Sequence, residues 1–443
     1  MIKKIDDKID GMKRFIIIWL GQSVSLMGTS MTKFALSIWA YQQVGKATTM
    51  ALLLFFSYLP YTLFSPLAGS VVDKYDRKTI MILSDLGAGL VTVLILYLQI
   101  TGQLNIWHLY LTEALVGALE AFQVPAYISS TTLMIPKEKY SKASGMRSFS
   151  GSASRVFAPV LAGFFLVQVG IRGVLVTDLI TFGVAMITLM LVRVPNPKKT
   201  ENSAHQRSTW QNFKFSINYL LEKRGLLILM IIFILINLAA AMTYFGILPA
   251  MILARSGNDK MVWAMVHSMM GVGGVVGSLL VSTWGVPKKK VLTILITTAA
   301  SFLFGDILFA AGRTVFFWAI AGFLSSLFIP FMLGAREAIW QSKVDPEIQG
   351  RIFSVKGMSQ TCLMPIGFVL GGFLADYVFE PAMANPTLLS RMFSWLVGTG
   401  KGSGMALMFF FTSILGLAIA IFGYFNKEFL YLEDNIADHD YTS

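Results

Sequence analysis

Charged residues are scarce in this chain. Asp, Glu, Lys and Arg together make up 14% of its 443 residues, whereas 55% of the residues are hydrophobic. A soluble domain usually has about 25% charged and about 45–50% apolar residues, so the composition excludes an ordinary soluble protein and indicates a membrane protein. The net charge of +12 does not indicate nucleic-acid binding, because the bases gather in particular loops and not along one stripe.

Cysteine and histidine are rare as well. The single cysteine, Cys362, lies in an apolar run, so neither an internal disulfide nor a cysteine-based metal site is expected. The four histidines, among them His108 and His267, have no ligand spacing, and we predict no metal and no cofactor. The stretch from Gly271 to Gly277 has the letters of a dinucleotide fingerprint, but helix packing is the better interpretation because no strand precedes it. With no nucleophile and base set in view, the sequence does not predict an enzyme.

Long apolar runs dominate the rest of the sequence. A helix needs about 20 apolar residues to span a bilayer, and twelve stretches reach that length. The predicted spans are 15–43, 48–72, 79–100, 106–135, 143–168, 172–193, 226–253, 262–284, 291–311, 315–342, 352–379 and 405–426. The fold class predicted is therefore an all-α membrane protein with twelve transmembrane helices. A shorter apolar stretch, 388–397, is predicted to lie along the membrane surface.

Basic residues are distributed unevenly between the loops. The two tails and the loops on their side carry 24 Lys and Arg, whereas the opposite loops carry 7. By the positive-inside rule, we expect both termini in the cytoplasm. The basic start of the chain predicts a retained first helix and not a cleaved signal, because the apolar run reaches about Val44 with no small-residue cleavage site.

A polar stretch divides the spans into two groups of six. The expected organisation is a cytoplasmic tail (1–14), a six-helix bundle (15–193), a cytoplasmic linker (194–225), a second six-helix bundle (226–426) and a cytoplasmic tail (427–443). A faint repeat supports this division, since Gly69-Ser70 recurs as Gly277-Ser278, and Pro136-Lys137-Glu138 has an echo in Asp345-Pro346-Glu347 at nearly the same offset. Such a duplication predicts two pseudo-symmetric bundles related by an axis along the membrane normal.

One short hydrophilic loop lies between two long apolar runs. It follows Gly69 and reads Asp73-Lys74-Tyr75-Asp76-Arg77-Lys78. Asp73 can cap a helix N-terminus there, while Arg77 and Lys78 contact headgroups or helix C-termini. Two interpretations remain open: a gating loop built from Gly69, Asp73, Lys74, Arg77 and Lys78, or a basic loop that only sets the topology.

This loop resembles the signature of the major facilitator superfamily, G-x-x-x-D-[RK]-x-G-[RK]-[RK], found between the second and third helices. The chain departs from the signature at Asp76, where glycine is usual. Twelve spans, two halves and a long central linker match too, so the resemblance covers the whole chain. It implies a transporter that works by alternating access, with the first, fourth, seventh and tenth helices around a central cavity.

Three motifs narrow the resemblance to the bacterial drug-efflux branch, which includes macrolide and enterobactin exporters. They are Trp19-Leu20-Gly21-Gln22-Ser23-Val24-Ser25, Ala121-Phe122-Gln123-Val124-Pro125-Ala126-Tyr127 and Arg155-Val156-Phe157-Ala158-Pro159-Val160-Leu161-Ala162-Gly163. The third is similar to the antiporter signature G-P-x-x-x-G, with Ala158 in place of its first glycine, followed by Pro159 and Gly163. These residues, with Gly145 and Gly151, predict either a bending helix or ordinary close packing. The arginine that many antiporters carry in the fourth span is missing between His108 and Pro136.

Five ionisable residues lie well inside the expected spans: Lys33, Glu113, Glu120, Arg155 and Asp306. Each costs a few kcal/mol in hydrocarbon, so each is expected to face a cavity or a partner. Heights along the helices, at about 1.5 Å per residue, predict two pairs, Lys33 with Glu113 and Glu120 with Arg155. By the resemblance, the fourth span lines the cavity, which makes both glutamates candidates for proton carriage or for holding a cationic substrate. Structural ion pairs are the alternative interpretation.

The function predicted is a secondary transporter of the bacterial plasma membrane that exports amphiphilic organic compounds in exchange for protons. Two alternatives remain: a dedicated exporter of one endogenous metabolite, such as a siderophore or a peptide, and a non-transporting scaffold or sensor on the same fold. The partners expected are a small amphiphilic molecule, protons and membrane lipid, with the chain acting as a monomer.

Overall fold

The computed structural model describes residues 11–136, 139–194 and 209–438, and in these ranges the chain is helical without any strand. Parts of the expected tails and linker (1–10, 195–208 and 439–443), as well as Lys137 and Glu138, lie outside the described residues. The chain divides into two compact units. The first comprises Met1–Lys199 with Trp263–Ser268, and the second comprises Thr200–Val262 with Met269–Ser443.

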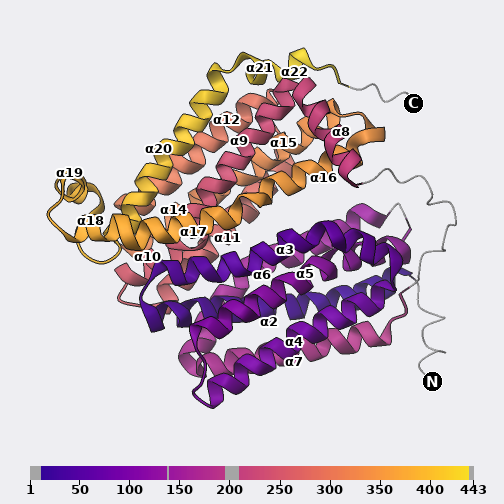
Figure 1. Cartoon of the computed structure of the whole chain (residues 1–443), viewed down its shortest axis with the longest axis horizontal. Helices are drawn as coiled ribbons and strands as arrows, with labels where there is room; N and C mark the ends of the chain where they lie inside the picture. Colours follow the sequence, from indigo (N-terminus) through magenta and orange to yellow (C-terminus); the bar gives the residue numbers. More distant parts are fainter. Residues whose placement is uncertain (1–10, 137–138, 195–208, 439–443) are drawn as a thin grey trace. The chain divides into compact units, whose positions relative to one another are not determined.

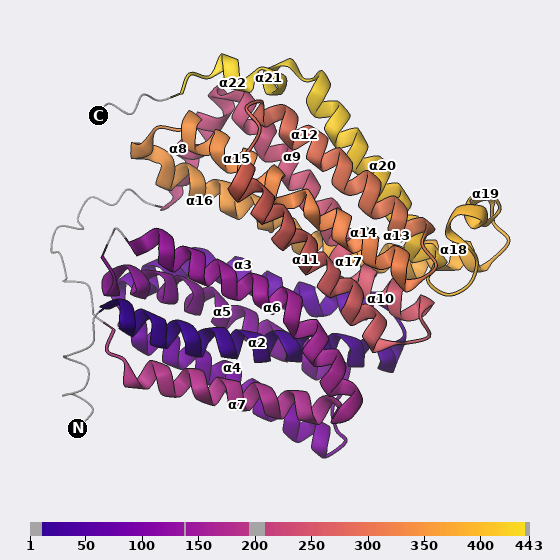
Figure 2. The same cartoon turned by 180° about the vertical axis from the view of Figure 1, so that it is seen from behind.

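The first unit is built from six long helices. They are α2 (Gly11–Val44), α3 (Ala47–Lys74), α4 (Arg77–Ile100), α5 (Ile106–Met134), α6 (Tyr140–Gln168) and α7 (Gly170–Leu191). Within this unit α4 and α7 lie side by side (Figures 1 and 2), and α7 also packs along α2. Gly45 and Gly170 adopt positive φ angles of 71° and 68°, which lets the chain reverse direction within one or two residues.

The helices α3 and α5 approach each other closely. A Cβ atom added at Gly117 of α5 would overlap the carbonyl oxygen of Ser57 in α3, so only glycine permits this approach. Pro60 and Pro66 lie inside α3, and Pro125 lies inside α5. Prolines are tolerated in membrane helices because neighbouring groups can satisfy the freed carbonyls.

The second unit contains the remaining elements, except that Trp263–Ser268 of α11 belongs to the first unit. They are α8 (Thr209–Glu222), α9 (Arg224–Ala240), η2 (Ala241–Phe245), α10 (Ile247–Arg255), α11 (Lys260–Trp284), α12 (Lys290–Ala300), η3 (Ser301–Asp306), α13 (Ile307–Ala311), α14 (Val315–Leu327), α15 (Ile329–Lys343), α16 (Pro346–Cys362), α17 (Met364–Leu374), η4 (Ala375–Phe379), α18 (Glu380–Ala384), α19 (Leu388–Val397), α20 (Ser403–Phe425), α21 (Lys427–Leu430) and α22 (Leu432–Asn435). Consecutive segments join into six spans, of which the seventh, ninth and eleventh of the chain each contain one π-helical turn: η2, η3 and η4. Such turns are rare and frequently mark functional sites.

Eleven helices in the described part of the chain are long and apolar enough to cross a membrane. The twelfth expected span is α5, which has 29 residues and therefore sufficient length. It is less apolar because it carries Glu113, Glu120 and Gln123, all of which line an internal cavity. The prediction of an all-α membrane protein with twelve spans is confirmed, and the polarity of α5 already points to the site.

The predicted surface segment forms α19, with the bounds Leu388–Val397. Thr387 caps its N-terminus, accepting a hydrogen bond from the backbone N–H of Ser390 at 3.3 Å. Its exposed apolar side chains Leu388, Met392 and Trp395 recur at helical spacing and so share one face. In Figure 1, α18 and α19 lie at one end of α20, and α21 and α22 lie at the other end.

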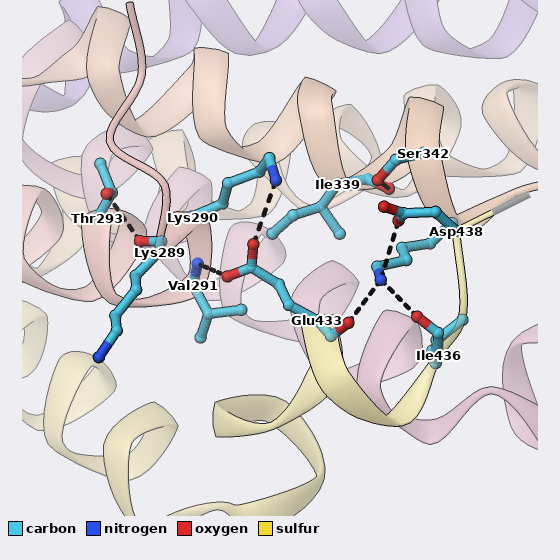
Figure 3. Close-up of polar contacts among 10 residues, drawn as sticks. Lys289, Lys290, Val291, Thr293, Ile339, Ser342, Glu433, Ile436 and Asp438 are labelled. Atoms are coloured by element: carbon cyan, nitrogen blue, oxygen red, sulfur yellow. Dashed lines mark hydrogen bonds and ion pairs between the residues drawn. The ribbon is translucent and has the colours of Figure 1, made fainter.

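The segment 427–438, expected as part of a tail, is held on the second unit (Figure 3). The Glu433 carboxylate accepts the backbone N–H of Val291 at 3.0 Å and the Lys290 ammonium at 3.3 Å, so it caps the start of α12. Lys343 of α15 donates to the carbonyl oxygens of Glu433, at 2.6 Å, and of Ile436. Its ammonium also lies 2.9 Å from the Asp438 carboxylate. These contacts tie the segment to α12 and α15.

Candidate functional site: a charged cavity in the first unit

The first unit encloses a cavity of about 290 Å³. Helices α2, α4 and α5 provide most of its lining, with contributions from α6 and α7. Apolar and aromatic side chains such as Trp19, Leu26 and Phe182 form much of the wall. The charged lining side chains are Asp85, Glu113, Glu120, Asp178, Lys33 and Arg147, which amount to four carboxylates against two cations.

An ion pair joins α2 and α5 across the cavity wall. The Lys33 ammonium lies 2.6 Å from a carboxylate oxygen of Glu120, and the two side chains are 38% and 40% exposed. The predicted partner of Lys33 was Glu113, and that pairing is wrong. Heights of Cα atoms fail here because the four-carbon stem of lysine carries its ammonium well away from its own Cα. The exposure of both groups means that solvent or a ligand can reach the pair.

The other predicted pair, Glu120 with Arg155, is wrong as well. Arg155 is exposed, does not line the cavity and forms no ion pair with any described residue. Glu113 does line the cavity, seven residues before Glu120 on the same face of α5, and the hydroxyl of Ser57 is its hydrogen-bond partner. The two glutamates therefore share the cavity, but only Glu120 has a cation in contact.

A second polar cluster in the cavity involves Asp85. The amide of Gln22 donates to Asp85 at 2.9 Å, and the amide of Gln123 donates to the side-chain oxygen of Gln22 at 3.1 Å. Two motifs of the sequence meet here, because Gln22 belongs to the first and Gln123 to the second. Trp19 and Ser23 anchor the same wall on α6, the indole donating to the carbonyl of Met146 at 2.9 Å and Ser23 lying 2.6 Å from the Ser150 hydroxyl.

Two cavity carboxylates escaped the sequence analysis. Asp178 of α7 is buried, with an exposed fraction of 4%, and accepts hydroxyl hydrogen bonds from Thr29 at 3.2 Å and Thr92 at 3.3 Å. Asp85 lies nine residues into its 24-residue helix. Both stand inside apolar runs, so the signal that identified Glu113 and Glu120, an acid within a span, could also have identified them.

Two further residues of the second motif, Phe122 and Pro125, have structural roles beside the cavity. Phe122 and Phe64 lie with their ring centroids 6.2 Å apart, which packs α5 against α3. Pro125 lies inside α5 without ending it. Val124 and Tyr127 of this motif line the cavity together with Gln123, whereas Phe122 and Pro125 do not.

The predicted basic loop (69–78) is mostly helical, because α3 extends to Lys74 and α4 begins at Arg77, and only Tyr75 and Asp76 lie between the two helices. Its side chains stabilise helix ends. Asp76, which stands where the signature has glycine, caps the N-terminus of α4 by accepting the backbone N–H of Thr79 at 2.8 Å. Lys78 donates to the carbonyl oxygens of Met190 and Val192, at 3.0 and 2.7 Å, and so caps the C-terminus of α7.

Arg77 of the same loop is buried and donates to the carbonyl oxygen of Ser129 in α5 at 2.8 Å. Lys74 is exposed, with its ammonium 5.4 Å from the centroid of the Tyr75 ring. The surroundings of Gly69 and of the Asp73 side chain, the other two residues of the predicted gate, lie outside the described part of the structure.

The antiporter-like motif lies within α6, which runs unbroken from Tyr140 to Gln168 with Pro159 inside it. Ala158, Pro159 and Gly163 are all buried. A Cβ added at Gly145 or Gly151 would meet no atom within 4 Å, so these two glycines do not mediate close packing. In the second unit, Gly273 and Gly277 do so, because a Cβ there would overlap the carbonyl oxygens of Phe323 and Leu327. The packing interpretation of that glycine-rich stretch is confirmed.

Asp306, the fifth ionisable candidate, is not part of this cavity. It lies in η3 of the second unit and is completely buried. The structure therefore brings together Lys33, Glu113 and Glu120 but leaves Arg155 and Asp306 elsewhere.

Comparison with known proteins supports the resemblance found in the sequence. The Major Facilitator Superfamily model matches residues 18–305. Macrolide efflux protein A of Streptococcus pyogenes is 26% identical over 373 residues, covering 82% of this chain and 90% of that protein. Multidrug resistance protein MdtG of Escherichia coli is 24% identical over 408 residues, covering 88% and 95%.

Solved structures show the same fold. The crystal structure of nucleoside transporter NupG has a TM-score of 0.66 at 12% identity, covering 94% of this chain and all of that one. A bacterial homologue of the iron transporter ferroportin, in its inward-facing state, has a TM-score of 0.63 at 14% identity, covering 92% and 99%. With a matching family model over most of its length, twelve spans and the loop signature between α3 and α4, this chain belongs to the Major Facilitator Superfamily, a family of membrane transporters and not of enzymes.

Proposed function

We propose that this chain exports amphiphilic organic cations in exchange for protons, using the cavity of the first unit as the binding site. The observation that carries the proposal is the charge of that cavity, where four carboxylates face two cations between apolar and aromatic walls. An uncompensated negative charge attracts a cation, and the apolar wall accommodates the hydrocarbon part of an amphiphile. The two efflux relatives named above support export as the direction.

Glu120 is the group through which substrate and proton compete in this proposal. Its carboxylate is neutralised by Lys33 at 2.6 Å in the structure. A cationic substrate replaces the lysine as counter-ion, whereas a proton removes the charge itself, so the two occupants exclude each other. Glu113, seven residues away on the same face, provides a second carboxylate for the same exchange. Lys33 takes the role of the helix 4 arginine that many antiporters carry.

The remaining features of the proposal follow from the sequence. The chain works as a monomer in the lipid of the bacterial plasma membrane, with both termini in the cytoplasm, as the distribution of Lys and Arg predicts. The basic loop (69–78) then lies at the cytoplasmic face, where Arg77 and Lys78 hold the ends of α4, α5 and α7 together. These contacts all lie within the first unit, so the role of the loop in gating is to keep the cytoplasmic ends of these helices together while the face opens.

The test is a drug-susceptibility panel of bacterial cells that express the chain, with and without an uncoupler. Expression should raise resistance to cationic amphiphiles and not to anionic ones of similar size, and the uncoupler should remove the effect. Glu120→Gln should lower resistance at least tenfold, because the variant neither binds a proton nor neutralises a cation. Glu222→Gln, an exposed glutamate of α8 outside the cavity, is the matched control and should leave resistance unchanged.

Folding and mechanism are separated by a double variant. Glu120→Gln alone leaves Lys33 without its counter-ion, which can destabilise the unit. Lys33→Met combined with Glu120→Gln removes both charges and should restore normal amounts of folded protein in the membrane without restoring efflux. Unchanged efflux in either Glu120 variant would remove this residue from the mechanism.

A further inference from the structure

Asp306 is the centre of a polar cluster buried in the second unit. The Tyr244 hydroxyl donates to Oδ1 of its carboxylate, and the Thr412 hydroxyl donates to Oδ2 at 2.7 Å. The carboxylate and Tyr244 both lie on π-helical turns, η3 and η2, and Thr412 lies on α20. Asp306 and Thr412 are 0% and 5% exposed. The cluster thus links the seventh, ninth and twelfth spans deep in the unit.

The first unit has the same arrangement on the corresponding spans. Asp178 of α7, the sixth span, accepts Thr29 of α2 on Oδ1 and Thr92 of α4 on Oδ2, at 3.2 and 3.3 Å. In each unit a buried aspartate therefore joins the first, third and sixth spans through one hydroxyl donor on each carboxylate oxygen. The aspartate lies on the sixth span of the first unit (Asp178) but on the third span of the second unit (Asp306). The same three spans are thus joined in both units, although the aspartates do not occupy equivalent positions in the sequence.

No cation contacts either aspartate among the described residues. The elements packed against η3, besides η2 with Tyr244, are α12, α13, α14 and α20. Their titratable side chains are only Lys290 and Tyr424, which lie 16 residues before Asp306 and 12 residues after Thr412, about 24 and 18 Å along their helices. A charge on Asp306 is therefore balanced by hydroxyl dipoles alone, in contrast to Glu120.

Asp178 has one cation in its surroundings. The helices packed against α7 are α2, α4 and α6, whose cavity-lining charges are Lys33, Asp85 and Arg147. Of these only Lys33 has an electrostatic interaction with Asp178, and its ammonium is bound to Glu120. Asp178 thus also depends on hydroxyl donors for the balance of its charge.

Both clusters can hold either form of the carboxyl group. The Thr412 hydroxyl also lies 3.0 Å from the carbonyl oxygen of Phe409, and the Thr92 hydroxyl lies 3.3 Å from that of Ala88. When a proton binds, the threonine can turn its hydrogen to this carbonyl and accept the carboxyl O–H on its oxygen. Neither state leaves a buried donor without an acceptor, so a proton can be gained or lost without a large penalty in hydrogen bonds.

We propose that Asp306 and Asp178 are a matched pair of proton-binding carboxyl groups, one in each unit, that take up and release protons separately from the Lys33–Glu120 ion pair. In the ionised form Asp306 holds Tyr244 of η2 and Thr412 of α20 together. Protonation reverses the hydrogen bond to Thr412, whose hydroxyl then donates to the carbonyl oxygen of Phe409, and so rearranges the link between the seventh, ninth and twelfth spans. Proton binding is thereby coupled to the geometry of two π-helical turns. This inference adds two proton sites to the transport function proposed above but does not depend on any substrate.

The experiment is a pH titration of the purified full-length protein in lipid nanodiscs, followed by the infrared carbonyl stretch of protonated carboxyl groups. Wild-type protein should show a band from buried protonated carboxyls that disappears as the pH rises. Asp306→Asn and Asp178→Asn should each remove a separate component of that band, and the double variant should remove both. Asp434→Asn, at an exposed position on α22, is the matched control and should leave the band unchanged.

Two further variants protect the test against misfolding. Thr412→Val and Thr92→Val keep the aspartates but remove one hydroxyl donor each, so they should shift the corresponding component without deleting it. A band that stays unchanged in the aspartate variants would overturn the proposal. Where an aspartate variant does not fold, an unchanged band in the corresponding threonine variant would overturn it. Because no drug is present, this outcome is distinct from failure of the export function, in which the Glu120→Gln cells stay resistant.

Discussion

The two units of this transporter differ in how their carboxylates are balanced by cations and helix ends. In the first unit, four carboxylates line one cavity, and the ion pair between Lys33 and Glu120 is more than a third exposed. In the second unit, Glu433 caps α12, and Glu380 accepts the backbone N–H groups of Gly402 and Met405 near the start of α20. Glu337, which is 38% exposed, lies between two cations, Arg336 and Lys356, each 2.7 Å away. The first unit thus gathers an excess of carboxylates around one cavity, whereas these carboxylates of the second unit are matched by helix ends or by cations.

Packing in the first unit differs between its core and its cavity wall. Both units contain large side chains with no exposed surface, such as Phe15 in the first and Trp340 and Leu229 in the second. In the first unit, Leu26 lines the cavity and is 42% exposed, although it lies in the middle of the long helix α2. A cavity large enough for part of a ligand costs packing energy, so we infer that the cavity wall of the first unit gives up packing for binding, while the buried cores hold the frame.

The largest effect that tests this contrast is on stability. Leu229→Ala should destabilise the protein by about 2–5 kcal/mol, because it removes buried methyl groups and leaves a void. Leu26→Ala, the same chemical change at a cavity-lining position, should cost less than about 1 kcal/mol. Unfolding of the purified variants in mixed detergent micelles measures both. Equal losses would show that the cavity wall is packed as tightly as the core.

The contact of Lys343 with the C-terminal segment should have the next largest effect. Lys343→Met leaves the carbonyl oxygens of Glu433 and Ile436 without this donor, at a cost of about 1–3 kcal/mol. The segment 427–438 should then become sensitive to limited proteolysis, which gel analysis of the fragments detects. Lys427→Met, at an exposed position of α21, is the control. A segment that stays resistant would mean that its apolar contacts suffice.

The N-cap of α4 in the first unit, Asp76, offers a test with a smaller expected effect. Asp76→Ala should cost about 1 kcal/mol, because it removes the N-cap of α4, whereas Asp76→Gly should cost only a few tenths. The glycine variant also restores the family signature at this position. Thermal unfolding compares the two variants. A glycine variant as unstable as the alanine variant would indicate that Asp76 acts through something other than the cap.

The smallest effect concerns Asp438 and pH. The hydrogen bond from Lys343 lowers the pKa of Asp438 below its ordinary value of 3.8. A lowered folded-state pKa stabilises the folded protein above the ordinary value, and the contribution is lost as the pH falls below about 4. Because the side chain is 67% exposed, the effect should stay below about 0.5 kcal/mol. Asp438→Asn should remove this part of the pH dependence, as acid unfolding curves of the two proteins would show, while a curve identical to wild type would exclude the contribution.

The ionisable residues of the site could be predicted, because each can be identified from its own position in the sequence. An acid or base within an apolar run identifies itself, as Lys33, Glu113 and Glu120 did. The partners were harder to predict. Heights of Cα atoms along the helices do not show how far a lysine side chain reaches, so the predicted pairing of Lys33 failed. Arg155 is exposed and does not line the cavity, which its place within an apolar run does not reveal. Asp76 looked like a departure from a signature, and only its contact with Thr79 shows that it caps a helix.

The sequence by itself determined that this protein crosses a membrane twelve times, because the cost of exposing a polar backbone to lipid leaves long apolar helices as the only solution for such runs. It also determined the family, because the signature between the second and third spans is a local sequence pattern that can be recognised without knowing any contact. Only the tertiary structure decided which ionisable groups meet, since contacts between residues up to 149 positions apart, as from Thr29 to Asp178, depend on how helices are rotated and packed. Rotation and packing are collective properties of all the side chains, and no single span encodes them.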